Sequence, residues 1–172
     1  LSQIPSGGNI AIPNDATNQG RALLLLQSAG LIKLNDGGSP LSTPADIDAS
    51  ASKVKVTPVD AAQTVTSLPS VDGAVINNNF ANDAGIDPKA ALFADSAKSD
   101  NAAPYINVFA ARPEDKNNET LLKAIKIWHD PEVAKAVLKD SNNSAVLVKD
   151  RSQAELQHIT DGLQADIKKA RK

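Results

Sequence analysis

The sequence contains no cysteine and no methionine. Without cysteine, thiol catalysis, thiolate metal sites and disulfide bonds are excluded. The lack of cysteine also fits an exported protein. Because methionine is absent, Leu1 is not a translation start, and we expect the chain to be a processed or truncated product.

Aromatic residues make up only 3% of the chain, and the net charge is −2. Stacking on bases needs aromatic side chains and attraction to phosphates needs positive charge, so we expect no nucleic-acid partner. No apolar run approaches the ~20 residues that span a bilayer. The isolated residues His129 and His158 lack metal-ligand spacing, and no nucleophile or paired-carboxylate motif stands out. We therefore expect no catalytic residue, no metal site and no cofactor.

Apolar runs and helical patterns alternate along the first two thirds of the chain. This order predicts an α/β fold with a mostly parallel sheet flanked by helices. The predicted strands cover residues 9–13, 53–59, 71–79, 91–95 and 105–112.

The last third is mostly helical, with predicted helices over 118–129, 131–140 and 152–172. Asp130 is the predicted N-cap of the second of these helices, with Pro131 at its first position. A single strand is predicted there, at 144–148. Because one strand cannot satisfy its own backbone hydrogen bonds, we expect further strands to come from elsewhere.

The stretch NDATNQGRALLLL, residues 14–26, predicts a helix with Asp15 or Thr17 as its N-cap and Gly30 just after its end. Arg21 lies in or near its first turn, where the helix dipole mildly disfavours a cation. Arg21 is either a surface residue paired with an acid or a clamp for the carboxylate of a ligand. Gly20 would let such a ligand approach the backbone closely. The spacing excludes the common phosphate-binding loops.

Asparagines gather at two predicted strands. Asn77 and Asn79 would share one face at the end of the 71–79 strand, and Asn107 lies inside the run PYINVFAAR. Neutral amides suit a zwitterion, because each offers donors and an acceptor. The alternative at 77–79 is turn chemistry. At Asn107 it is a backbone partner, since an unpaired buried amide costs about 1–3 kcal/mol.

Three segments of the chain together resemble the NlpA/MetQ family of methionine-binding lipoproteins from bacterial ABC importers. They are IAIPNDATNQGRALLLLQSAGLIKL, DGAVINNNFANDAGIDPKAALFAD and PYINVFAAR, in register from about residue 8 to residue 148. The resemblance implies a type II periplasmic-binding-protein fold whose two hinged lobes close over an amino acid. It also implies delivery to an ABC permease and its ATPase, and an extracytoplasmic location with a lipid anchor to the cell membrane.

The resemblance also implies roles for single residues. Arg21 of the GRAL stretch would hold the substrate carboxylate, and Asn79 and Asn107 would contact the bound amino acid. Phe80 replaces the usual tyrosine of the family, so no hydroxyl contact is expected there. With two further residues from the same stretches, the predicted ligand-binding residues are Arg21, Asn79, Asn107, Asn18 and Asn77.

The resemblance implies that the first part of one lobe is missing from this chain. We expect residues 1–107 to form a nearly complete substrate-binding lobe, and 108–172 to return to the other, incomplete lobe. A second copy could supply the missing strands by pairing or strand exchange, giving a homodimer. The resemblance implies no role for the tail 149–172.

Three other functions stay open. One is a protein of the same fold that binds another amino acid or a short peptide. The second is an α/β enzyme acting on a small carboxylate, against which the lack of an acid–base constellation argues. The third is a surface lipoprotein with an adhesive role and a protein partner.

Overall fold

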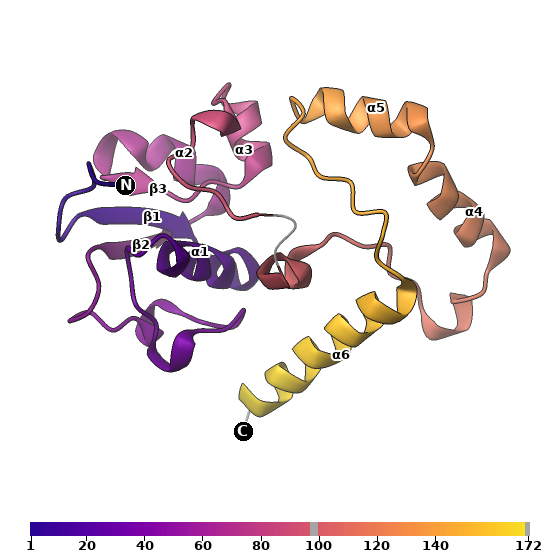
Figure 1. Ribbon diagram of the computed structural model, residues 1–172, viewed down its shortest axis with the longest axis horizontal. Coiled ribbons are helices and arrows are strands. Elements are labelled where there is room, and N and C mark those ends of the chain that lie inside the picture. Colours follow the sequence, from indigo (N-terminus) through magenta and orange to yellow (C-terminus); the bar gives the residue numbers. More distant parts are fainter. Residues whose placement is uncertain (97–99, 171–172) are drawn as a thin grey trace. The chain divides into compact units, whose positions relative to one another are not determined.

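The computed structural model describes residues 1–96 and 100–170 (Figure 1). Contacts divide the chain into two units, Leu1–Asp95 and Ser96–Lys172. The sequence places the boundary at residue 107. The assignment of the two parts to lobes of a two-lobed protein stays a prediction.

The first unit is built on a three-stranded parallel sheet in the order β2-β1-β3. In the central strand, Ile10 lies between Val56 of β2 and Gly73 of β3. Because all strands run in one direction, their carboxyl ends lie at one edge of the sheet, where ligands of open α/β sheets bind. The strands are β1 Asn9–Pro13, β2 Lys55–Val59 and β3 Gly73–Ala74.

Helices α1 and α2 both contact β1 (Figure 1). The α-helices of this unit are α1 Ala16–Ser28, α2 Thr64–Ser67 and α3 Asn78–Asp83. Short 3-10 turns connect the elements: η1 Asn35–Gly37, η2 Pro44–Asp46, η3 Ala61–Gln63, η4 Leu68–Ser70 and η5 Pro88–Ala90.

The core of the first unit joins β1 to α1. Ile12 and Leu23 are both 0% exposed, and Leu26 is buried beside them. Burying one such side chain contributes roughly 1.5–3 kcal/mol. The other two leucines of the run 23–26, Leu24 and Leu25, are half-buried. This distribution shows that α1 is covered on more than one side.

The ends of α1 follow the local sequence. Asp15 is the N-cap, and its side chain accepts a hydrogen bond from the backbone of Asn18 at 3.1 Å. Gly30 follows the C-cap residue Ala29 with φ +70°, a conformation that glycine adopts without strain. Both ends confirm the prediction, and Asp15 rather than Thr17 is the capping residue.

One strand prediction in this unit is too long and another is wrong. The predicted strand 71–79 ends at Ala74, and Asn78 and Asn79 form the first turn of α3 instead. Asparagine favours turns and helix starts over strands, so this outcome agrees with its local preference. Residues 91–95 form no strand and are exposed. The sheet edge at β3 is only two residues long and offers little backbone for a further strand.

The second unit is helical in its described residues, and α6 packs against η6. Asp130 caps α5 and Pro131 is its first residue, as the sequence predicts. The elements are η6 Asp100–Tyr105, η7 Pro113–Asp115, α4 Glu119–Trp128, α5 Pro131–Asp140 and α6 Gln153–Ala170.

The strands predicted at 105–112 and 144–148 are absent from the described part of this unit. A strand needs a neighbour for its N–H and C=O groups, and no described residue of the unit offers one. Apolar side chains therefore stay exposed along these runs, among them Val108, Phe109 and Val146. Phe109 finds an aromatic partner in Trp128, edge to face, with ring centroids 5.8 Å apart.

Candidate ligand-binding site

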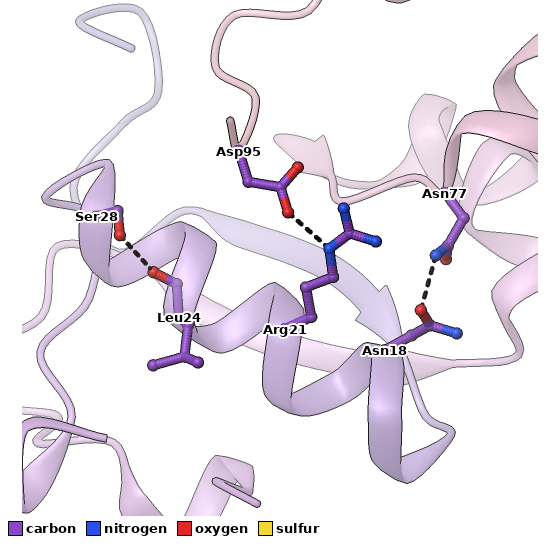
Figure 2. A network of polar contacts seen from close by, with 6 residues as sticks. All are labelled: Asn18, Arg21, Leu24, Ser28, Asn77 and Asp95. Atoms are coloured by element: carbon purple, nitrogen blue, oxygen red, sulfur yellow. Dashed lines mark hydrogen bonds and ion pairs between the residues drawn. The ribbon is translucent and has the colours of Figure 1, made fainter. Parts of the chain in front are cut away.

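Two predicted site residues meet at the carboxyl edge of the sheet. Strand β1 leads into the first turn of α1, which carries Asn18, and β3 leads to Asn77, the residue before α3. Because β1 and β3 are neighbours, these two chain segments lie together. Asn77 Nδ2 donates a hydrogen bond to Asn18 Oδ1 at 2.8 Å (Figure 2).

Asp15 sets the orientation of both amides. Asn18 Nδ2 donates to the two carboxylate oxygens of Asp15, each at 3.0 Å. Because a carboxylate only accepts hydrogen bonds, Asn18 turns its amino group to Asp15 and its oxygen to Asn77. Asn77 in turn uses its amino group toward Asn18. Its own oxygen is therefore left as an acceptor for some other group.

Asn77 Oδ1 is buried and has no hydrogen-bond partner among the described residues. A buried acceptor without a donor costs about 1–3 kcal/mol. Such an atom calls for a hydrogen-bond donor, and a positively charged donor satisfies it most strongly.

Arg21 lies in the second turn of α1, because the helix begins at Ala16. The dipole effect is confined to the first turn, so the cation is barely disfavoured there. Arg21 Nε donates to Asp95 Oδ2 at 2.6 Å, and both side chains are about one third exposed, at 37% and 35%. The interpretation of Arg21 as an arginine paired with an acid is thus confirmed in this structure. Its role as a clamp for a ligand stays a prediction.

Arg21 and Asn18 belong to one side of α1. They are three residues apart, a spacing that places side chains next to each other on a helix surface. In Figure 2, Asp95 approaches Arg21 and Asn77 approaches Asn18 from the same side of the helix. A cation and an unpaired acceptor are therefore presented on the same side of α1.

The other two predicted residues lie outside this network. Asn79 is exposed on α3. Asn107 belongs to the second unit, where it is exposed and outside any regular element. The premise of a buried amide inside a strand was therefore wrong for Asn107. Contact of either residue with a ligand stays a prediction.

Gly20 does not serve a ligand in this structure. A Cβ at this position would lie 2.1 Å from the backbone oxygen of Pro40. The missing side chain therefore admits the loop after η1, and the expectation that Gly20 makes room for a ligand is corrected.

The sequence reasoning missed Asp15 and Asp95 as members of the site. The sequence predicts Asp15 only as a cap. From the same position its carboxylate also accepts the two hydrogen bonds from the side chain of Asn18. Asp95 is 74 residues from Arg21, and no local pattern signals that pairing.

Two carboxyl groups with a lowered pKa take part in local hydrogen bonding. The hydrogen bond from the Ser50 hydroxyl is the main cause that lowers the pKa of Asp48. The backbone N–H of Ser152 lowers the pKa of Glu155, with the Ser152 hydroxyl as the second cause.

The side chains of this site can bind an anion at Arg21 and a hydrogen-bond donor at Asn77 Oδ1. Within residues 1–96 and 100–170, no group of three or more His, Cys, Asp or Glu side chains is placed to hold a metal ion. No helix in the described part of the chain is both long and apolar enough to cross a membrane.

Comparisons with known proteins all point to one family of lipoproteins. The sequence profile of the NlpA lipoprotein family matches residues 1–148. The chain is 38% identical over 149 residues to the D-methionine-binding lipoprotein MetQ of Salmonella typhi, covering 85% of this chain and 54% of that protein. It thus spans about half the length of the curated relatives it matches.

Two solved structures are similar over most of this chain. The substrate-binding protein of a methionine transporter from Streptococcus pneumoniae is 41% identical, with a TM-score of 0.72 over 83% of this chain and 55% of that chain. A nutrient-binding protein from Burkholderia cenocepacia, bound to methionine, is 38% identical. Its TM-score is 0.72 over 84% of this chain and 60% of that chain.

Proposed function

Because the chain belongs to the NlpA lipoprotein family, we propose that it binds methionine or a related amino acid as the substrate-binding component of an ABC importer. The predicted family resemblance and α/β fold of a periplasmic substrate-binding protein are confirmed. The relatives include substrate-binding proteins of methionine transport, which agrees with binding rather than catalysis.

One observation carries the proposal: Arg21 pairs with a carboxylate on the side of α1 where Asn77, bonded to Asn18, keeps a buried acceptor without a partner. A free amino acid has a carboxylate and an ammonium group on one carbon. Its carboxylate matches the guanidinium of Arg21, and its ammonium matches Asn77 Oδ1. A plain carboxylate or a simple cation satisfies only one of the two groups.

Asn79 and Asn107 are proposed as further contacts to the amino acid. Asn107 belongs to the second unit, and the resemblance to binding proteins whose two lobes close over an amino acid supports its proposed contact. Since the chain spans about half of its relatives, the rest of the cage would come from a longer chain or from a second copy.

The partners follow from the same assignment. We infer that the loaded protein delivers its amino acid to an ABC permease with an ATPase. Its relatives are named as lipoproteins, which supports an extracytoplasmic protein held to the membrane by lipid.

Calorimetry with L-methionine tests the proposal, on this chain and on a form extended to the length of its relatives. We expect binding by the extended form at micromolar or lower Kd, and loss of binding in Arg21→Ala. Arg151→Ala is the matched control, because Arg151 lies beyond the residues that match the family. Unchanged affinity in Arg21→Ala would overturn the assignment of Arg21. Mass spectrometry of ligand retained during purification identifies the amino acid.

A further inference from the structure

Asp95 occupies the place at Arg21 that the proposed function gives to the carboxylate of the ligand. Its Oδ2 lies 2.6 Å from Arg21 Nε, the distance of a strong charge-assisted hydrogen bond. We propose that Asp95 is an internal substitute for the ligand carboxylate, which the ligand must displace, and that Asp95 thereby sets the affinity of the site. This inference rests on the proposed function for the identity of the ligand.

Asp95 takes the Nε–H of Arg21, so a ligand carboxylate that uses this donor competes with Asp95 for it. The single hydrogen on Arg21 Nε is directed to Asp95 Oδ2. An incoming carboxylate that takes this hydrogen must push Asp95 away, and the two negative charges repel each other at close range. Binding of the ligand carboxylate and pairing of Asp95 therefore exclude each other at Nε.

The displacement is easy to achieve. With about one third of each side chain exposed, the ion pair belongs to the class of solvent-exposed pairs. Breaking an ion pair of that class changes an equilibrium constant by at most about fivefold. Residues 91–96 are exposed and form no helix or strand, so Asp95 can leave Arg21 without disturbing the core.

Asp95 satisfies only one half of the site. As a carboxylate it serves Arg21, but it has no donor for the buried oxygen of Asn77. An amino acid supplies both a carboxylate and an ammonium group, whereas acetate supplies only the first. Exchange with Asp95 therefore favours amino acids over plain carboxylates.

The test compares this chain with Asp95→Asn, which keeps the shape of the side chain and removes its charge. The Nε–H signal of Arg21 is followed by ¹⁵N NMR during titration with acetate, a bare carboxylate. We expect the acetate midpoint to fall by up to about fivefold in Asp95→Asn. Asp83→Asn is the matched control, since Asp83 is an exposed carboxylate on α3 and loses the same charge.

The acetate midpoint decides the role of Asp95. An unchanged or higher midpoint in Asp95→Asn overturns the proposal, because Asp95 would then position Arg21 rather than compete for it. An equal fall in Asp83→Asn also overturns it, since net charge alone would explain the change. A parallel titration of the form extended to the length of its relatives with L-methionine decides the proposed function separately. If methionine fails to bind that extended form while acetate shows the expected shift in this chain, the competition by Asp95 stands and the proposed function fails.

Discussion

Asn77 Nδ2 donates a hydrogen bond to Asn18 Oδ1 at 2.8 Å across 59 positions of the sequence. This bond joins the segment after β3 to the first turn of α1. Asn18 in turn donates to the Asp15 carboxylate. The three side chains thus form a polar chain in which each amide donates to the next side chain, from Asn77 through Asn18 to Asp15. That direction leaves an acceptor at Asn77, which the proposed ammonium group of the ligand would use.

Asp15→Asn should reduce binding of amino acids selectively. Asparagine is as good an N-cap as aspartate, so α1 stays capped. Its amino group, however, repels the amino group of Asn18 and weakens the orientation of Asn77. We expect methionine affinity to fall about 2- to 10-fold, the range of one hydrogen bond. Binding of 4-(methylthio)butanoate, which lacks the ammonium group, should not change in calorimetry.

Asp60→Asn is the control for that experiment, because Asp60 caps η3 by the same kind of hydrogen bond. It should leave both ligands unaffected. Equal weakening of both ligands by Asp15→Asn would contradict the polar chain and indicate a general effect on α1.

Gly20→Ala and Gly162→Ala should change stability in opposite directions. The new methyl group at Gly20 would lie 2.1 Å from the Pro40 oxygen, so we expect a loss of about 1–3 kcal/mol in the free energy of unfolding. Gly162 lies inside α6 with nothing within 4 Å, so alanine should stabilise that helix by roughly 0.5–1 kcal/mol. Urea denaturation followed by circular dichroism measures both. A neutral Gly20→Ala would mean that the loop at Pro40 moves freely.

Leu23→Ala and Leu25→Ala separate the buried and half-buried sides of α1. Leu23 is 0% exposed, and its truncation should cost about 2–5 kcal/mol, as for other buried leucines. Leu25 is only half-buried, so the same change should cost clearly less. Equal losses in urea denaturation would contradict the packing of α1 described here.

The start of α6 should lose order in acid. Glu155 and Ser152 form a reciprocal cap, in which Glu155 Oε2 accepts from the Ser152 backbone N–H at 2.7 Å and Ser152 Oγ accepts from the Glu155 N–H at 3.2 Å. The bond from the Ser152 backbone N–H, with that from the Ser152 hydroxyl to the same Oε2 as the second cause, holds the pKa of Glu155 below its ordinary value of 4.5. A carboxyl group whose pKa is lower in the folded than in the unfolded state stabilises the folded state at any pH above its unfolded pKa. This stabilisation is lost as the pH falls through the folded pKa.

The Ser152 amide signal in NMR reports this loss of the cap. We expect faster amide exchange, relative to the intrinsic rate, as the pH falls below about 4.5. Glu155→Gln keeps an acceptor without a titrating charge and should remove the pH dependence. A Ser152 amide that keeps the same response in Glu155→Gln would show that another group controls the helix start.

Local features of the fold were readable from the sequence. The caps Asp15 and Asp130 and the glycine end of α1 were predicted correctly, because each depends on bonds between residues a few positions apart. The same holds for β1, whose apolar residues are flanked by turn residues. The strand predictions at 105–112 and 144–148 failed, because a strand depends on a neighbour that local sequence does not contain.

The sequence by itself determined that a helix follows Asp15 or Thr17 and that Arg21, Asn18 and Asn77 are candidates for an amino-acid site. Only the tertiary structure decided that Asn77 reaches Asn18 and that Asp95 pairs with Arg21. It also decided that Gly20 meets Pro40 rather than a ligand. These pairings join residues far apart in the chain, and the parallel order β2-β1-β3 brings the segments after β1 and β3 to one edge. Which donor meets which acceptor there depends on distances that residue types alone do not specify.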